Sequence, residues 1–349
     1  MTTTVEVINA LKRVMDPEIH RSVVELNMVR NLVVGDDGSV SFTLALTVPT
    51  CPLSSQISAD ARTAIQALPG VKEVNVSLGA MTDEERNAVL GIAPQPTAAH
   101  EIKRVIAVMS GKGGVGKSLV TGLLATALKR AGYNVGILDA DITGPSIPKL
   151  FGVHGPLKGS ETGIEPAQSR TGIKLMSINL LLPDEGQAVI WRGPMISGAI
   201  KQFWGDVQWG VLDYLLVDLP PGTSDAALTV MQDLPINGIL LVTTPQSLAT
   251  MIVKKALDMA QKMNTPILGV IENMAGFVAP DTGKHYDIFG PSHADEVAKQ
   301  AGAPLLANLP IDSTIAAHCD AGEIETITLD ELNACVEALA LNQSALAEA

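Results

Sequence analysis

A glycine-rich segment places the strongest constraint on this chain. Residues 111–118 read Gly-Lys-Gly-Gly-Val-Gly-Lys-Ser and satisfy the pattern G-x-x-x-x-G-K-[ST] in full. An apolar run at 105–109 precedes the segment and a helix-like stretch at 119–130 follows it, so it joins a strand to a helix. Glycines let backbone N–H groups turn inward around phosphate oxygens, and the helix N-terminus adds partial positive charge. The segment therefore predicts a site for a nucleoside triphosphate.

Each position of this loop has an expected contact with the nucleotide. Lys117 should reach the β- and γ-phosphates, and the hydroxyl of Ser118 should ligate Mg²⁺. The residues expected to surround the phosphates are Gly111, Lys112, Gly113, Gly114, Val115, Gly116, Lys117 and Ser118. Three of the glycines also spell G-x-G-x-x-G, a dinucleotide fingerprint, with Asp139 at a suitable distance for a ribose contact. That alternative is disfavoured because only the triphosphate pattern requires the Lys-Ser pair that ends the loop.

Acidic residues follow two further apolar runs. The runs at 135–138 and 215–217 read as buried strands that end at Asp139 and Asp218, and Asp141 comes two residues after the first of these. Ligands of open α/β sheets bind at the carboxyl edge of the strands, where a carboxylate can hold Mg²⁺ through water. A second interpretation is that Asp139 caps the helix that follows it. The Pro-Pro-Gly sequence after Asp218 argues against a capping role there.

A second lysine narrows the class of nucleotide-binding protein. Lys112 follows the first glycine directly, so the loop resembles the deviant phosphate loop of the MinD, ParA and nitrogenase-iron-protein ATPases. The resemblance implies a homodimer in which Lys112 reaches the partner's ATP and neutralises charge during phosphoryl transfer. It also implies that Asp141 positions the attacking water, Asp139 supports the metal shell and Asp218 begins the second switch. Lys112, Lys117 and Asp141 are thus the expected catalytic residues, and a solvated loop lysine is the plainer alternative for Lys112.

Several further motifs stand in the order found in one branch of that class. They are Gly-Pro-Ser (144–146), Trp-Arg-Gly-Pro-Met (191–195), Pro-Pro-Gly-Thr-Ser-Asp (220–225), Thr-Pro-Gln (244–246) and Glu-Asn-Met (272–274). Over about residues 103–325 the chain resembles the Mrp-type (ApbC-like) iron–sulfur cluster carrier ATPases. This implies an ATPase that binds clusters and transfers them to apoproteins, in contact with iron–sulfur assembly factors. It also implies that Asn273 reads the adenine edge, while Pro310 and Asp312 belong to the loop that closes over the base.

The chain departs from that family at the expected cluster site. Members usually carry a C-x-x-C pair shortly after Glu-Asn-Met, and the four thiolates of a homodimer then hold a bridging [4Fe–4S] cluster. Ala279 and Thr282 stand at the two cysteine positions here. Two alternatives to a carrier therefore stay open. One is a cluster-free nucleotide switch that recruits clients through its N-terminal domain, and the other is a positioning ATPase of the MinD/ParA type.

Residues 1–91 are predicted to form a small α+β domain. Helical spacing occurs at 5–15 and 53–68, and strand patterns occur at 29–34, 40–46 and 71–78. A Gly-Asp-Asp-Gly sequence joins the first two strands, which is a strong hairpin signal. Asp-Pro-Glu (16–18) and Thr-Val-Pro-Thr-Cys-Pro (47–52) resemble the small domain of iron–sulfur cluster assembly factors. That resemblance places Cys51 in a loop before a helix.

The chain has three cysteines, which are too few and too scattered for a disulfide framework or a sequence-local zinc site. A thiol near a helix N-terminus has its thiolate favoured, so we expect Cys51 to act in cluster binding or partner docking. A buried structural thiol is the alternative. Cys319 is either an inert thiol, which is the favoured interpretation, or a replacement cluster ligand. Cys335 lies in an apolar helical pattern at 329–341 and is interpreted as a core residue.

The larger part of the chain is predicted to be an α/β domain. A segment with prolines at 92–103 predicts a linker, followed by a P-loop ATPase domain at 104–341 and a tail at 342–349. Continuous apolar runs are typical of parallel sheets with helices on both faces. Such runs occur at 105–109, 135–138, 214–217, 238–242, 267–271 and 304–306.

The net charge of the chain limits the kinds of partner that it is expected to bind. The chain has a formal charge of −13 and a pI near 4.9, with no basic run, so bulk electrostatics do not favour nucleic acid or an anionic membrane surface. Residues 331–349 hold no lysine or arginine, unlike the basic amphipathic helix by which MinD-like proteins bind membranes. No apolar stretch reaches the length of a membrane helix, and no basic-then-apolar N-terminal signal is visible. These features predict a cytoplasmic protein with reduced thiols.

Overall fold

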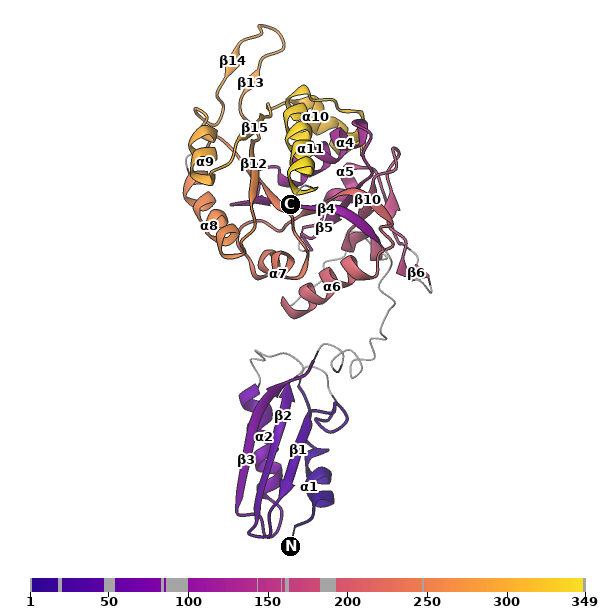
Figure 1. Ribbon diagram of the computed structural model, residues 1–349, viewed down its shortest axis with the longest axis vertical. Coiled ribbons are helices and arrows are strands. Elements are labelled where there is room, and N and C mark those ends of the chain that lie inside the picture. The colour runs from indigo at the N-terminus through magenta and orange to yellow at the C-terminus, as the bar shows by residue number, and fades with distance from the viewer. Residues whose placement is uncertain are drawn as a thin grey trace. The chain divides into compact units, whose positions relative to one another are not determined.

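The computed structural model divides into two compact units, residues 1–95 and 96–349 (Figure 1). The residues that it describes are 2–17, 21–46, 54–82, 85, 100–142, 144–157, 159–160, 163–182, 193–246 and 248–347. Cys51 and the predicted linker up to residue 99 lie outside them. The first strand of the second unit begins at Glu101, so regular structure starts inside the range 92–103 that the sequence favours for the linker.

The N-terminal unit combines a sheet with two helices. Its elements are α1 (Thr4–Leu11), β1 (Val29–Val34), β2 (Ser39–Leu46), α2 (Ser54–Gln66) and β3 (Glu73–Ala80). β1 and β2 form the expected antiparallel hairpin, while β2 and β3 run parallel because α2 connects them. Burial alternates along β2, where Val40, Phe42 and Leu44 join a core with Leu11 of α1 and Ile57 of α2. The predicted α+β architecture of this region is confirmed.

The second unit is built on a large sheet. Its described strands have the order β15-β12-β11-β4-β10-β5-β9-β8, and every neighbouring pair runs parallel except β8 and β9. The strands are β4 (Glu101–Ser110), β5 (Val135–Asp139), β8 (Ala167–Gln168), β9 (Lys174–Met176), β10 (Val211–Asp218), β11 (Gly238–Thr243), β12 (Ile267–Glu272) and β15 (Leu305–Asn308). The six strands expected from apolar runs are all present. Two small hairpins, β6–β7 (Gly159–Ser160, Gly163–Ile164) and β13–β14 (Phe277–Val278, His285–Tyr286), lie outside this sheet.

Helices cover both faces of the sheet, as the sequence predicts. The helices are α4 (Lys117–Arg130), α5 (Ile147–Leu150), α6 (Gly193–Gly205), α7 (Asp225–Asp233), α8 (Leu248–Lys262), α9 (Ala294–Ala301), α10 (Ser313–Asp320) and α11 (Asn333–Ala347). Short 3-10 helices occur at Ile178–Leu181, Ile324–Thr326 and Asp330–Leu332. Within the described residues, no helix is both long and apolar enough to span a bilayer.

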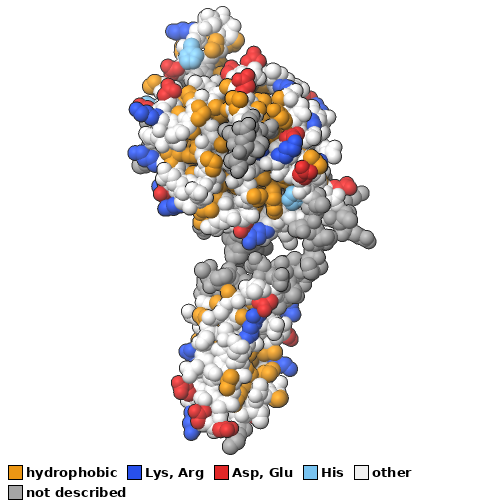
Figure 2. All heavy atoms as spheres, in the orientation of Figure 1, with side chains coloured by type: hydrophobic (Ala, Val, Ile, Leu, Met, Phe, Trp, Pro, Cys, Tyr) orange, Lys and Arg blue, Asp and Glu red, His pale blue; other side chains and the backbone are white. Residues whose placement is uncertain are grey.

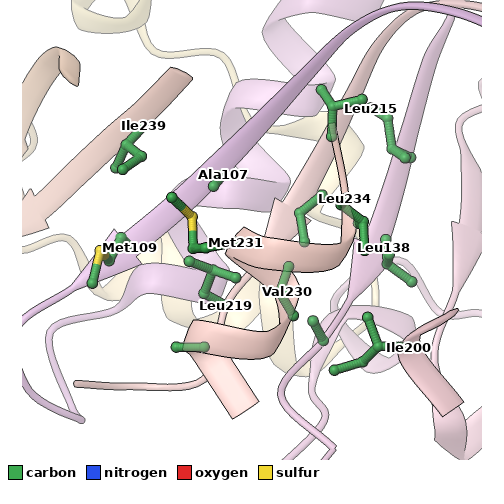
Figure 3. Close-up of a cluster of buried hydrophobic side chains, with 14 of the residues drawn as sticks. Ala107, Met109, Leu138, Ile200, Leu215, Leu219, Val230, Met231, Leu234 and Ile239 are labelled. Atoms are coloured by element: carbon green, nitrogen blue, oxygen red, sulfur yellow. The ribbon is translucent and has the colours of Figure 1, made fainter. Parts of the chain in front are cut away.

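Two hydrophobic cores fill the spaces between the sheet and its helices. Side chains of β4 alternate between them: Ala107 and Met109 join the core beneath α6, α7, α8 and α9 (Figure 3), and Ile106 and Val108 join the core beneath α4, α5, α10 and α11. Burial on both faces explains why the central strands read as continuous apolar runs. Because these strands are parallel, their carboxyl ends lie at one edge, which brings together the loops that carry the predicted site residues.

Candidate nucleotide-binding site

The phosphate loop joins β4 to α4, and its backbone conformation depends on glycine. Gly114 and Gly116 both have a φ of 78°, which L side chains rarely adopt. A Cβ atom on Gly116 would lie 2.2 Å from Nδ2 of Asn273, whereas one on Gly114 would meet nothing within 4 Å. The close approach at Gly116 arises because Asn273 donates a hydrogen bond to the carbonyl oxygen of Val115 at 2.9 Å. The phosphate loop and the residue that follows β12 are therefore in close contact and joined by a hydrogen bond.

Two loop side chains converge on one buried carboxylate. The Nζ atom of Lys117 lies 2.7 Å from Oδ1 of Asp218, and the hydroxyl of Ser118 donates to Oδ2 at 2.5 Å. Thr121, one turn farther along α4, donates to Oδ1 at 2.8 Å. Asp218 is fully buried and Lys117 is 6% exposed, so the charges attract at a lower effective dielectric constant than in water. The structure thus brings together three residues that the sequence assigned to phosphate and metal binding.

Asp139 holds the loop that follows β5. Its Oδ1 atom accepts from the N–H of Asp141 at 3.2 Å, and Oδ2 accepts from the N–H groups of Ser146 and Ile147 at 3.1 and 3.2 Å. Oδ2 also accepts from the hydroxyl of Ser177 at 3.2 Å. Burial, together with a nearby carboxylate, raises the pKa of Asp139 to about 8. The contacts at the start of α5 match the capping interpretation, and the role of Asp139 in the metal shell stays a prediction.

Lys112 contacts its own chain. Its Nζ atom donates to Oε1 of Gln246, and its backbone oxygen accepts from the hydroxyl of Ser110 at 3.0 Å. The segment after β10 reaches the same part of the loop, because the N–H of Gly222 donates to the Ser110 oxygen at 3.0 Å. Lys112 and Asp141 both line a hollow of about 340 Å³ over the phosphate loop. Action of Lys112 across a dimer stays a prediction.

The predicted adenine contacts lie at the ends of β12 and β15. Asn273 follows β12 directly and is 3% exposed, with its amide turned to the phosphate loop. Pro310 and Asp312 follow β15, and the Asp312 carboxylate caps α10. The intervening Ile311 donates its N–H to the Gly276 carbonyl oxygen at 2.7 Å, so this loop is joined to the base of the β13–β14 hairpin. Recognition of adenine by these residues stays a prediction.

The segment that carries the cysteine pair in resembling proteins is the β13–β14 hairpin, which projects from the second unit (Figure 1). Ala279 and Thr282 lie in its turn, where the N–H of Ala279 donates to the carbonyl oxygen of Lys284 at 3.0 Å. The projection at the top of Figure 2 carries hydrophobic, basic, histidine and acidic side chains side by side, so no single chemical type dominates it. Neither Ala279 nor Thr282 can supply a thiolate, so this hairpin lacks the cluster ligands that the resembling carriers have there.

The two described cysteines belong to the core beneath α4 and α11. Cys319 and Cys335 are buried free thiols among apolar side chains. Burial raises the pKa of both thiols, that of Cys335 to about 12, which opposes the thiolate form that metal ligation needs. These positions favour the inert interpretation for Cys319 and the core interpretation for Cys335. Within the described ranges, no group of three or more His, Cys, Asp and Glu side chains is arranged to hold a metal ion.

Comparison with known proteins identifies the family. Residues 101–343 match the family model described as NUBPL iron-transfer P-loop NTPase, which covers more than half of the chain. The chain belongs to this iron-transfer P-loop NTPase family. Residues 4–78 match a second model, described as iron-sulfur cluster assembly protein. The two resemblances read from the sequence are thereby confirmed.

Relatives of this iron-transfer NTPase cover both of its units. Iron-sulfur cluster carrier proteins from Synechocystis sp. and Deinococcus radiodurans are 43% and 44% identical to it, over 89% and 90% of this chain and 88% and 87% of theirs. A nucleotide-binding protein from Archaeoglobus fulgidus, solved in complex with ADP, is 47% identical with a TM-score of 0.61. That similarity covers 66% of this chain and 91% of the solved one.

Sequence reasoning missed three side chains that complete the site. Thr121 holds Asp218, Ser177 holds Asp139 and Gln246 holds Lys112. Thr121 had a readable signal, since it lies four residues after Lys117 and thus on the same helix face. The other two contacts join segments that are distant in sequence, so only the order of the strands reveals them.

Proposed function

We propose that this protein is an ATP-binding and ATP-hydrolysing carrier that binds iron–sulfur clusters and transfers them to apoproteins. The observation that carries the nucleotide part is the convergence of Lys117 and Ser118 on the buried Asp218. Membership of the iron-transfer P-loop NTPase family supports the cluster part. The match of the N-terminal unit to iron-sulfur cluster assembly proteins supports it independently.

In this proposal ATP replaces the contact that the phosphate loop makes with the end of β10. Lys117 leaves the Asp218 carboxylate and binds the β- and γ-phosphates, while the loop N–H groups surround the phosphate oxygens. Asp141, which lines the hollow, orients the attacking water. Lys112 of a second chain neutralises charge that develops in the transition state, so the active form is a homodimer. Asn273, Pro310 and Asp312 hold the base.

The residues around Ser118 fit Mg²⁺. The Ser118 hydroxyl and the Asp218 carboxylate are hard oxygen donors, and the two oxygens already lie 2.5 Å apart. A Mg²⁺ ion held by these two groups would supply positive charge beside the phosphates of bound ATP. Asp139 supports this shell indirectly, because its carboxylate fixes the N–H of Asp141 and the start of α5.

The cluster ligands differ from those of the resembling carriers. Ala279 and Thr282 cannot bind iron through sulfur. Cys51 of both subunits supplies two of the four thiolates that a [4Fe–4S] cluster uses, so the other two come from an assembly factor, an apoprotein or small thiols in solution. Cys319 is the weaker candidate because its thiol is buried in an apolar core. Cluster transfer of this kind takes place in the cytoplasm, where thiols stay reduced.

A second candidate function rests on the same substitution. Without the cysteine pair, the protein can act as a cluster-free nucleotide switch that recruits a client through its N-terminal unit. Ala279 and Thr282 favour this candidate, and the cysteine at position 51 opposes it.

Anaerobic iron–sulfide reconstitution tests the cluster part. Iron per dimer and the visible spectrum would be measured for the wild type, Cys51→Ser and Cys319→Ser. We expect stoichiometric iron with a sulfur-to-iron absorption band, lost in Cys51→Ser and retained in Cys319→Ser. A protein that hydrolyses ATP but holds no iron, even with an apoprotein present, would support the nucleotide switch instead.

A further inference from the structure

The two lysines of the phosphate loop are held by acceptors of different charge. Lys117 lies 2.7 Å from the carboxylate of Asp218, so its charge is neutralised locally. Lys112 donates instead to the neutral amide oxygen of Gln246. In the described part of the chain, no ion pair joins Lys112 to a carboxylate. Lys112 is therefore positioned while its charge stays available to another group.

The contact between Lys112 and Gln246 follows from the order of the strands. β4 and β11 are parallel neighbours, and Val242 is the register partner of Ser110. Lys112 comes two residues after Ser110, and Gln246 comes four residues after Val242. Both side chains thus leave the same edge of the sheet, next to the hollow that Lys112 lines. Gln246 therefore lies beside the nucleotide site, to which its contact with Lys112 joins it.

The backbone of Lys112 is fixed independently of its side chain. Its carbonyl oxygen accepts from the Ser110 hydroxyl at 3.0 Å, and the neighbouring Gly222 N–H holds the Ser110 oxygen at 3.0 Å. Loss of the Gln246 contact would leave this backbone in place and free only the ammonium group. The side chain can therefore exchange acceptors without a change in the loop.

We propose that Gln246 is a positioning residue that holds Lys112 on its own chain until ATP-dependent pairing gives the ammonium a phosphate acceptor on the partner. This rests on the proposed function, in which Lys112 acts across a dimer. A neutral acceptor suits the task, since a hydrogen bond to an uncharged amide is weaker than one to a carboxylate and is exchanged more easily. Gln246 then opposes pairing to a limited extent and keeps resting chains apart.

Two substitutions at this position should act in opposite directions. Nucleotide-dependent dimerisation of the full chain would be measured by analytical ultracentrifugation with Mg²⁺ and a non-hydrolysable ATP analogue. Gln246→Ala removes the competing acceptor and should lower the dimer dissociation constant by about tenfold. Gln246→Glu provides a stronger acceptor and should raise that constant by about tenfold. A residue that only supported the fold would weaken pairing in both variants.

A chemical measurement on the resting protein gives a second readout. Acetylation of lysine amines by an N-hydroxysuccinimide ester would be followed by peptide mass spectrometry without nucleotide. Gln246→Ala should speed the modification of Lys112 several-fold and leave the exposed Lys299 unchanged. Gln246→Glu should slow it. Equal rates for Lys112 in all three proteins would overturn the proposal.

The controls separate this role from the proposed function. If the wild type does not pair in the presence of the analogue, both proposals fall. If the wild type pairs, Lys117→Ala does not, and both Gln246 variants pair as the wild type does, only the role of Gln246 is overturned. Opposite shifts in the two variants, with faster modification of Lys112 in Gln246→Ala, would establish it.

Discussion

The nucleotide site and the β13–β14 hairpin lie in the same unit but are held in different ways. At the nucleotide site the functional groups are buried and bonded to one another, as the Lys117–Asp218 pair shows. On the hairpin, Val278 is 52% exposed and Tyr286 is 42% exposed. A change at the first site therefore disturbs several partners at once, whereas a change on the hairpin disturbs few. This difference explains how the chain can lack the usual cluster thiols and still keep an intact phosphate loop.

The hairpin is nevertheless connected to the nucleotide site. The carbonyl oxygen of Gly276 accepts from the N–H of Ile311 at 2.7 Å, which joins the start of β13 to the loop after β15. The base of the hairpin is thus fixed, and freedom to vary is confined to its turn. The comparison predicts that substitutions will have large effects near Lys117 and small effects near Thr282.

The largest effect is expected from Lys117→Ala. The substitution removes the phosphate contact and leaves the buried carboxylate of Asp218 without its counter-charge, so ATP turnover should fall about a thousandfold. Phosphate release measures the effect, and circular dichroism would show whether the variant still folds. Turnover near the wild-type rate in a folded variant would refute the assignment of this site.

Gly116→Ala should come next in severity. The new methyl group would collide with Asn273 and place alanine at a φ of 78°, so we expect the free energy of unfolding to fall by about 2 kcal/mol and nucleotide affinity to drop at least tenfold. Gly114→Ala is the matched control, with the same φ but open space around it. Gly114→Ala should lower the free energy of unfolding by only about 1 kcal/mol, because only backbone strain opposes it. Chemical denaturation and binding of a fluorescent ATP analogue give both quantities, and equal losses in the two variants would contradict the steric account.

Asp139→Asn and Asp141→Asn should separate stability from catalysis. An amide at position 139 turns an N–H group toward other donors, among them Ser146 and Ile147, so the free energy of unfolding should fall by about 1–3 kcal/mol. Asp141 is partly exposed and lines the hollow, so Asp141→Asn should change stability by less than about 0.5 kcal/mol and lower kcat. Thermal melts and steady-state kinetics on both variants test this. A stability loss confined to Asp141→Asn would reverse the assignment.

The smallest structural effect is expected from the double substitution Ala279→Cys with Thr282→Cys. Thr282 is exposed, and its hydroxyl oxygen accepts only a long hydrogen bond, at 3.4 Å, from the N–H of Lys284. The free energy of unfolding should therefore change by less than about 0.5 kcal/mol. Denaturation of the reduced protein measures it. A loss above about 2 kcal/mol would show that the turn is held as firmly as the nucleotide site.

Local sequence patterns predicted those parts of the molecule that local physics determines. Long apolar runs identified the central strands, because buried parallel strands are apolar on both faces. β8 and β9 have two and three residues, too few for a periodic signal, and they were not predicted. The loop motif located Lys117 and Ser118, but the contact of Lys112 with Gln246 depends on β11 lying beside β4. Strand order comes from tertiary packing, and no local pattern encodes it.

The most direct test measures both sites in the same preparations. Iron per dimer after anaerobic reconstitution and phosphate release from ATP would be determined for the wild type, Lys117→Ala and the Ala279→Cys/Thr282→Cys variant. We predict that Lys117→Ala loses turnover and keeps the wild-type amount of iron, while the double-cysteine variant binds more iron per dimer than the wild type does and keeps its turnover. Iron that does not increase when the cysteine pair is restored, or turnover that is lost with it, would contradict the account of one fixed site and one replaceable site.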